Sequence, residues 1–144
     1  MSTHATIPSL AELMAEIAAA LSPIADQIEG LQIVPFLNFN PTPPSLDVYP
    51  GDPFQIGASF TAGDNQLFFT VRARASTSDQ QAGQELLMRM LDTADPAAVE
   101  VALAEIGLVV PSEAAGVSGF REYLEDAAAN GRLLGCEWRV TTFL

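Results

Sequence analysis

Residues 1–30 carry apolar side chains at steps of three or four, which is the spacing of one helical face. These positions are Ile7, Leu10, Met14, Ile17, Leu21, Ile24 and Ile28. Ser9 and Glu12 have the spacing of a capping box, and Gly30 is a natural stop. Pro23 removes an interior hydrogen bond and is expected to kink the chain. The pattern predicts a long N-terminal helix.

Residues 31–76 have the composition of strands, interrupted by a segment rich in proline. The stretch 31–40 reads as a strand that Pro35 would confine to a sheet edge. Five prolines follow between Pro41 and Pro53. Because proline lacks a backbone donor, we expect this second segment to be extended and to lie on the surface.

A hairpin is expected from strands 54–61 and 66–75, which flank a short loop rich in Gly, Asp and Asn. If the apolar residues share one face, Ile56 lies opposite Val71. The other face then carries Gln55, Gly57, Ser59, Phe68, Thr70, Arg72 and Arg74. Phe68 is out of place in this polar row, so it either covers its small neighbours or belongs to a contact surface.

Two short helices are expected within residues 78–107. Ser78 starts the first with capping-box spacing, and Asp95 followed by proline starts the second, which Gly107 ends. Closing strands are expected within 117–143, with a turn at Asn130-Gly131. In the last strand, four apolar residues alternate with polar or small ones: Leu134, Cys136, Trp138 and Val140.

These elements predict one α+β domain over residues 1–144, with a mostly antiparallel sheet on which the long N-terminal helix and two short helices pack. Hydrophobic residues make up 49% of the chain, which is enough for a core. No apolar run approaches the ~20 residues of a membrane helix, so no membrane partner is expected. The N-terminus lacks the basic region of a signal peptide, so we expect the protein to remain in the cytoplasm where it is made.

The formal net charge is −12, and all six basic residues are arginine. This balance argues against tight binding to nucleic-acid phosphates, although DNA could slide past such a surface. Arg72 and Arg74 share one strand face, and Arg139 has a similar position on another strand. Two alternatives stay open: these arginines pair with carboxylates across the sheet, or with acids of a neighbouring subunit.

The residues offer little for catalysis, metals or cofactors, and none is predicted. His4 is the only histidine and Cys136 the only cysteine, which we expect to be a buried thiol. Four aspartates lack the alternation of a calcium loop: Asp47, Asp52, Asp64 and Asp79. Glu122 and the acids at 125–126 are best read as a solvated loop, and no phosphate-binding glycine loop is present. An enzyme remains an alternative if changing Glu122 or Arg72 abolished some turnover.

Four segments carry a resemblance to a known family: PPSLDVYPGDPFQIG, QAGQELLMRMLD, DPAAVEVAL and GRLLGCEWRV. In order and spacing they are similar to small tail proteins of actinobacterial phages, which resemble the tail-terminator proteins of long non-contractile tails. The resemblance covers roughly residues 30–144, and the chain departs from the pattern after Val109.

The resemblance implies a virion protein without catalysis, present in the host cytoplasm during assembly. Such proteins form a homohexameric ring on the head-proximal end of the tail tube, stop its elongation and join it to the head-side connector or stopper protein. DNA passes through the ring without specific binding. The alternatives are another neck ring protein, such as a head-completion or stopper protein, or an α+β domain that binds a small ligand.

Seven aromatic and arginine residues are the candidates for contacts with another subunit or a partner. They are Phe39, Tyr49, Phe54, Phe68, Arg72, Arg74 and Arg139. For Tyr49 and Phe54, packing in the core is the competing interpretation.

Overall fold

The computed structural model describes residues 9–38, 42–56, 66–76, 78–106, 121–124 and 132–143. Its elements are α1 (Leu10–Ala25), β1 (Gln32–Val34), β2 (Ser45–Ile56), β3 (Gln66–Ser76), α2 (Gln80–Leu91), α3 (Val99–Ala104), β4 (Arg121–Leu124) and β5 (Arg132–Phe143). Helices and a mixed sheet together place the chain in the α+β class, as predicted.

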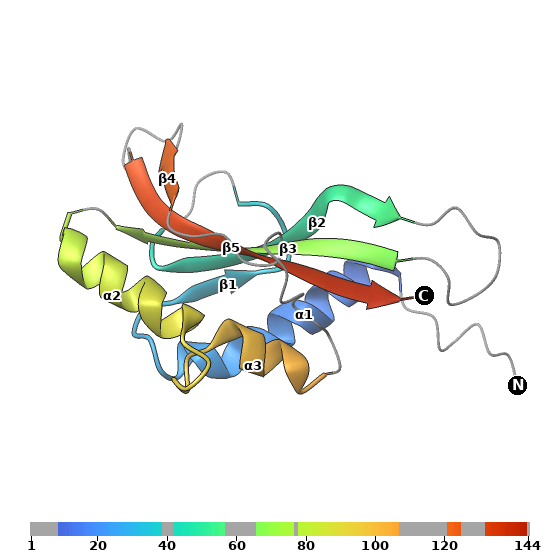
Figure 1. Ribbon diagram of the computed structural model, residues 1–144, viewed down its shortest axis with the longest axis horizontal. Helices are drawn as coiled ribbons and strands as arrows, with labels where there is room; N and C mark the ends of the chain where they lie inside the picture. Colours follow the sequence, from blue (N-terminus) through green and yellow to red (C-terminus); the bar gives the residue numbers. More distant parts are fainter. Residues whose placement is uncertain are drawn as a thin grey trace, which may run out of the picture.

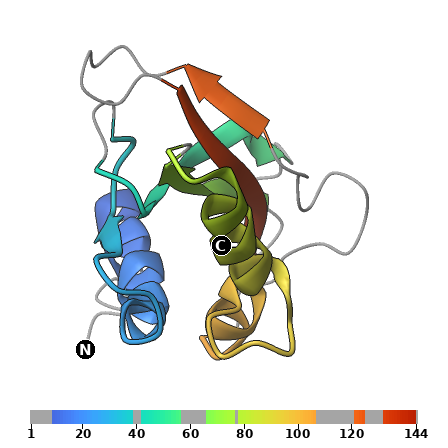
Figure 2. The same ribbon diagram turned by 90° about the vertical axis from the view of Figure 1, so that its left-hand side faces the viewer.

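The sheet has the order β1-β2-β3-β5-β4, and its helices lie on one face (Figure 1). β1 pairs with β2 in parallel, whereas the other three neighbouring pairs are antiparallel. α1 packs under β1 and β2, while α2 packs under β3 and β5, so the two helices divide the sheet between them (Figure 2). α3 contacts both helices, and its buried Val99 and Leu103 belong to the core cluster. Among the described helices, none has the length and apolarity needed to cross a membrane.

The N-terminal helix is shorter than predicted but starts where the sequence indicates. The Ser9 hydroxyl accepts a hydrogen bond from the Glu12 amide at 3.1 Å, which caps the first turn. The helix continues through Pro23, because a proline near the end of a helix removes little of its hydrogen-bond ladder. It ends at Ala25. Gly30, with φ of 77°, lies in the turn that follows.

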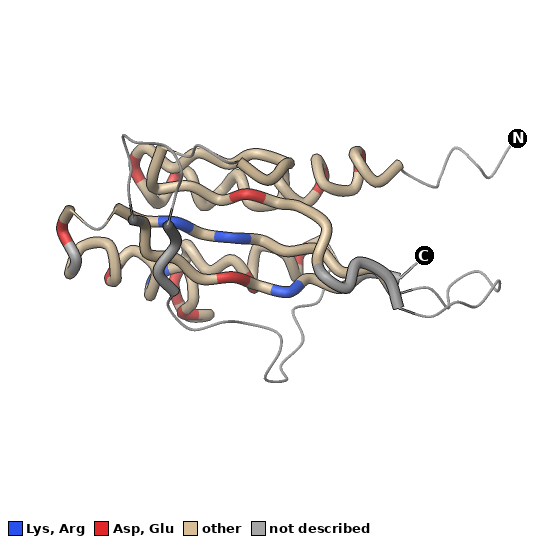
Figure 3. The backbone as a smooth tube through the Cα atoms, turned by 90° about the horizontal axis from the view of Figure 1, so that it is seen from above, with Lys and Arg blue, Asp and Glu red and all other residues tan. Residues whose placement is uncertain are grey.

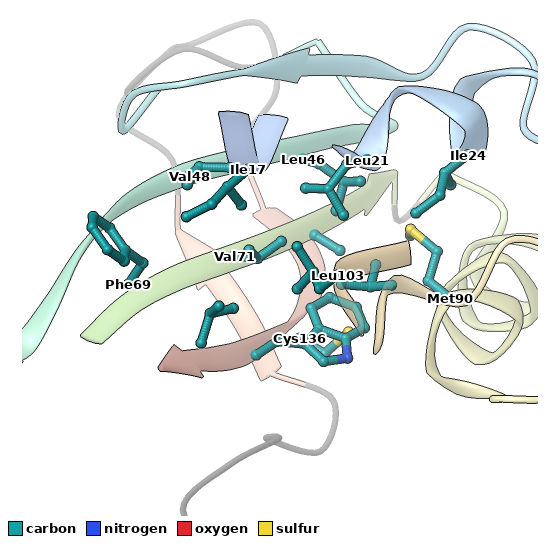
Figure 4. Packing of buried hydrophobic residues seen from close by; sticks show 14 of the residues in the cluster. Ile17, Leu21, Ile24, Leu46, Val48, Phe69, Val71, Met90, Leu103 and Cys136 are labelled. Atoms are coloured by element: carbon teal, nitrogen blue, oxygen red, sulfur yellow. The ribbon is translucent and has the colours of Figure 1, made fainter. Parts of the chain in front are cut away.

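The core lies between the helices and the sheet (Figure 4). Ile17 and Leu21 of α1 point toward Val48 and Leu46 of β2, and Ile24 points toward Met90. The cluster continues through Phe69, Val71, Met90, Leu103, Cys136 and Trp138. Truncating one such fully buried side chain to alanine costs roughly 2–5 kcal/mol, so this layer supplies most of the stability.

The predicted hairpin register is wrong, and the segment expected to be a surface loop is part of a central strand. β2 begins at Ser45, so Val48 lies opposite Val71, and Ile56 lies opposite Gln66. Apolar residues alternate with polar ones from 45 to 49, but the prolines around them obscured that pattern. The ladder tolerates Pro50 because the register shifts between Pro50 and Gln55. The predicted hairpin loop, 57–65, lies outside the described residues.

The edge position of β1 was predicted correctly. β1 ends at Val34, directly before Pro35, and stands at one end of the strand order. The Pro35 nitrogen has no hydrogen to offer a ladder, which fits an edge strand. The alternation in β5 is also confirmed, because Cys136, Trp138 and Val140 are buried on the helical side.

Two predicted helix starts need correction. Asp79, not Ser78, caps α2: its Oδ1 accepts from the Ala82 amide at 3.0 Å. Ser78 is engaged elsewhere, since its amide donates to the Ser76 hydroxyl at 3.2 Å. α3 begins at Val99 rather than after Asp95, whose carboxylate instead closes a local turn. The predicted stop at Gly107 and the turn at 130–131 lie outside the described residues.

Candidate functional site

The face of the sheet opposite the helices, here called the polar sheet face, gathers most of the predicted site residues. β2, β3 and β5 supply alternate side chains to it: Ser45, Asp47, Tyr49, Phe68, Thr70, Arg72, Arg74, Glu137, Arg139 and Thr141. Figure 3 shows basic and acidic positions side by side on the three central strands. Opposite charges on neighbouring strands stabilise the pairing of those strands. The register of the strands decides which charged side chains on this face are neighbours.

Arg74 and Asp47 form a buried ion pair on this face. The Arg74 Nη2 lies 2.7 Å from Asp47 Oδ2, and the two side chains are 1% and 0% exposed. Both also bind the main chain of Asn38: Arg74 Nη1 donates to its carbonyl at 2.8 Å, and its amide donates to Asp47 Oδ2 at 2.9 Å. The pair therefore ties the segment after β1 to β2 and β3.

Arg74 has room for this arrangement because its register neighbours are small. Ser45 lies opposite on β2, and Gly135 lies opposite on β5. Burying two charges carries a desolvation penalty that only good geometry and further hydrogen bonds offset. The hydrogen bonds to Asp47 Oδ2 and from both Arg74 Nη atoms contribute to that offset, so we interpret the pair as a structural tie.

Arg72 occupies the next position on the same face and is less buried. Its Nε and Nη2 lie 3.0 and 2.9 Å from Glu137 Oε2. The side chains of this pair are 23% and 22% exposed. The guanidinium also lies over the Tyr49 ring, with Cζ 5.1 Å from the ring centroid. Arg72 thus holds β2 and β5 together from the strand between them.

Tyr49 lies under this guanidinium as a neutral phenol. Burial is the main cause that raises its pKa to about 12, and the Arg72 charge opposes that rise. In the described part of the chain, the buried hydroxyl of Tyr49 has no hydrogen-bond partner. Its contribution here is ring packing rather than proton transfer at neutral pH.

Arg139 differs from the other two arginines. Its Cζ lies 3.9 Å from the centroid of the Phe68 ring, which is 5% exposed. Within the described ranges, no carboxylate hydrogen-bonds to Arg139, which is half-buried. Gly51 backs Phe68 from β2, because a Cβ there would lie 3.3 Å from Phe68 Cβ. Phe68 is therefore a packed platform for a guanidinium, which explains its place in a polar row.

Five of the seven predicted interface residues meet on this face: Tyr49, Phe68, Arg72, Arg74 and Arg139. Phe39 and the side chain of Phe54 lie outside the described residues. Of the two alternatives left open for the arginines, Arg72 and Arg74 show the first, pairing across the sheet. Sequence reasoning missed the identity of their partners. The available signal was one acid between apolar neighbours in each strand: Asp47 between Leu46 and Val48, and Glu137 between Cys136 and Trp138.

The chemistry available on the described residues is that of packing and ion pairing. Burial, with a smaller effect of Glu137, raises the pKa of the Cys136 thiol to about 12, so this thiol is not ionised at neutral pH. Among the described residues, no group of three His, Cys, Asp or Glu side chains could hold a metal ion.

Comparison with known proteins adds no relative: no protein-family model matches the chain, and no curated protein matches it.

Proposed function

We propose that this protein is a structural subunit of a phage tail. In this proposal it forms a homohexameric ring that caps the head-proximal end of the tail tube, stops tube elongation and joins the tube to the head-side connector. Four segments support it by their resemblance to tail-terminator-like proteins, including the strand around Asp47 and the strand around Trp138.

The observation that carries the proposal is the difference between the two layers of the subunit. One side of the subunit is a layer of helices, and the opposite side is the polar sheet face, on which Arg72 and Arg139 are partly exposed and Arg74 is buried (Figures 1 and 3). Ring contacts are heterologous, so each copy must present two different surfaces to its two neighbours. A two-layered subunit with unlike faces meets that requirement.

The charge of the chain fits passage of DNA through such a ring. At −12 per copy, the protein would repel phosphates rather than bind them. Specific nucleic-acid recognition would need clustered basic side chains, whereas Arg72 and Arg74 are already paired with acids of their own sheet. In this proposal DNA passes the ring without being held, and no cofactor or catalytic step is involved.

Tail length tests the proposal. The gene is deleted from the phage, and the particles are measured by electron microscopy, with complementation by the intact gene as the control. Overlong or heterogeneous tubes without heads support the terminator role. Uniform tails beside unattached heads would move the protein to the head side of the neck, as a head-completion or stopper protein. Intact infectious particles would contradict any assembly role.

A further inference from the structure

The described helices and the polar sheet face carry opposite charge balances. Residues 9–30 and 78–106 contain ten carboxylates and one arginine, Arg89. On the polar sheet face, three arginines stand beside two carboxylates, Asp47 and Glu137. Among the described residues, the helices therefore form a strongly acidic layer, whereas the polar sheet face carries one more arginine than carboxylates. Contacts between unlike faces are favoured electrostatically, and contacts between like helical layers are disfavoured.

On the polar sheet face, Arg139 is the arginine whose position suits binding of a carboxylate from another molecule. Stacking at 3.9 Å on Phe68 holds its guanidinium plane in place, which reduces the entropy lost on binding. Unlike Arg72 and Arg74, it has no hydrogen-bonded carboxylate among the residues that the structure describes. A planar fork fixed on an aromatic ring suits bidentate pairing with a carboxylate.

The complementary surface lies at α3. Val101 is 43% exposed and Ile106 is 47% exposed, which are high values for large apolar side chains. Glu105 stands between them on the chain, is exposed, and is the C-cap of α3. A carboxylate at a helix C-terminus faces the negative end of the dipole, and the last turn of α3 has no basic residue. An external cation at this position would relieve that repulsion close to two exposed apolar side chains.

Arg139 and Glu105 cannot be partners within one subunit, because α3 belongs to the helical layer and the sheet separates that layer from the polar sheet face (Figures 1 and 2). We infer that Arg139 of one copy docks on α3 of a second copy, with Glu105 as its carboxylate partner and Val101 and Ile106 as the apolar contact. The contact joins two different surfaces, so it repeats from copy to copy and closes into a ring under a suitable rotation. The ring geometry rests on the proposed function, whereas the pairing itself does not.

Charge reversal in the purified full-length protein tests the contact, with the sedimentation velocity measured over a range of concentrations at low salt. Arg139→Glu and Glu105→Arg are each expected to weaken self-association tenfold or more. The double variant, which restores the pair with opposite polarity, should recover most of it. Arg139→Lys keeps the charge but loses the fork, so an intermediate loss is expected. Glu29→Arg is the matched control, since it makes the same charge change at an exposed acid away from α3.

Thermal unfolding of every variant separates loss of contact from loss of fold. The inference is overturned if folded Arg139→Glu associates like the unmodified protein, or if the double variant is no better than the weaker single one. A chain that remains monomeric at every concentration also overturns it. Failure here leaves the tail-length experiment unaffected: a ring that forms with either single reversal would keep the proposed function and reject this contact.

Discussion

Arg72 and Arg74 stand two positions apart on one face of β3, and each binds a carboxylate on a neighbouring strand. Arg74 points toward β2, where it contacts Asp47 and the main chain of Asn38, and only 1% of its side chain is exposed. Arg72 turns toward β5 and remains 23% exposed. The same interaction therefore occurs in two dielectric environments, at positions that are two residues apart on one strand.

The difference predicts that burial, rather than the distance between charges, sets the loss of stability when one partner of a pair is removed. The closest N–O distances are 2.7 Å for Arg74 and 2.9 Å for Arg72, which are nearly equal. Removing one partner of the buried pair leaves a charge that water cannot reach, whereas removing one partner of the half-buried pair leaves a charge that water can solvate.

The largest expected effect comes from breaking the buried pair. Asp47→Ala leaves the Arg74 charge inside the protein and is expected to lower the free energy of unfolding by about 3–5 kcal/mol. Urea denaturation with two spectroscopic probes measures the loss. The double variant Asp47→Leu with Arg74→Met removes both charges and should recover most of the stability. A single variant as stable as the unmodified protein would contradict the structural role given to this pair.

Labelling of Cys136 measures the same contrast through another observable. The thiol is buried, and its pKa is raised to about 12, so an aromatic disulfide reagent should react slowly with the native protein at neutral pH. Arg74→Ala should increase the labelling rate about a hundredfold or more, because each 1.4 kcal/mol of lost stability raises the open population tenfold. Arg72→Ala should increase it only several-fold. Equal rates in the two variants would refute the comparison.

The half-buried pair should give a smaller and salt-sensitive effect. A double-mutant cycle with Arg72→Ala and Glu137→Ala is expected to yield a coupling energy of about 1 kcal/mol. Raising the salt concentration should reduce this coupling, since water and ions reach both side chains. A coupling of the size expected for Asp47 and Arg74, unchanged by salt, would show that exposure does not distinguish the pairs.

The smallest effect is expected at Tyr49, whose ring lies under Arg72. Tyr49→Phe keeps the ring under Arg72 and removes a buried hydroxyl, so stability at neutral pH should change by less than about 0.5 kcal/mol. The phenol pKa is raised by burial from 10.0 to about 12 in the folded chain. Its contribution to stability is therefore present below pH 10 and lost as the pH rises toward 12. The variant should unfold less readily in that alkaline range; an unchanged alkaline profile would contradict the shift.

Much of the fold could be predicted from local pattern. The Ser9 cap, the buried stripe of α1 and the alternation along β5 each depend on neighbouring residues alone, and the structure confirms them. β2 was missed because five prolines between Pro41 and Pro53 mask the alternation of Leu46 and Val48. The low strand propensity of this segment is outweighed by its pairing with β3, which depends on tertiary structure.

The site was less accessible for a similar reason. The shared face of Phe68, Arg72 and Arg74 follows from strand periodicity and was predicted. Their partners lie 27 residues away for Arg74 and 65 residues away for Arg72, so they depend on register between strands. A register error in the hairpin prediction therefore removed any chance of naming Asp47 as the partner of Arg74.

The hydrogen bonds that Asp47 and Arg74 make with the main chain of Asn38 limit which substitutions these three positions can accept. Asp47 and Arg74 grip an amide N–H and a carbonyl, so both bonds use main-chain atoms that every residue except proline supplies. With respect to these two bonds, position 38 tolerates almost any side chain, whereas positions 47 and 74 change only together. In an alignment of close homologues, positions 47 and 74 should therefore change together. Position 38 should accept many different residues, but not proline.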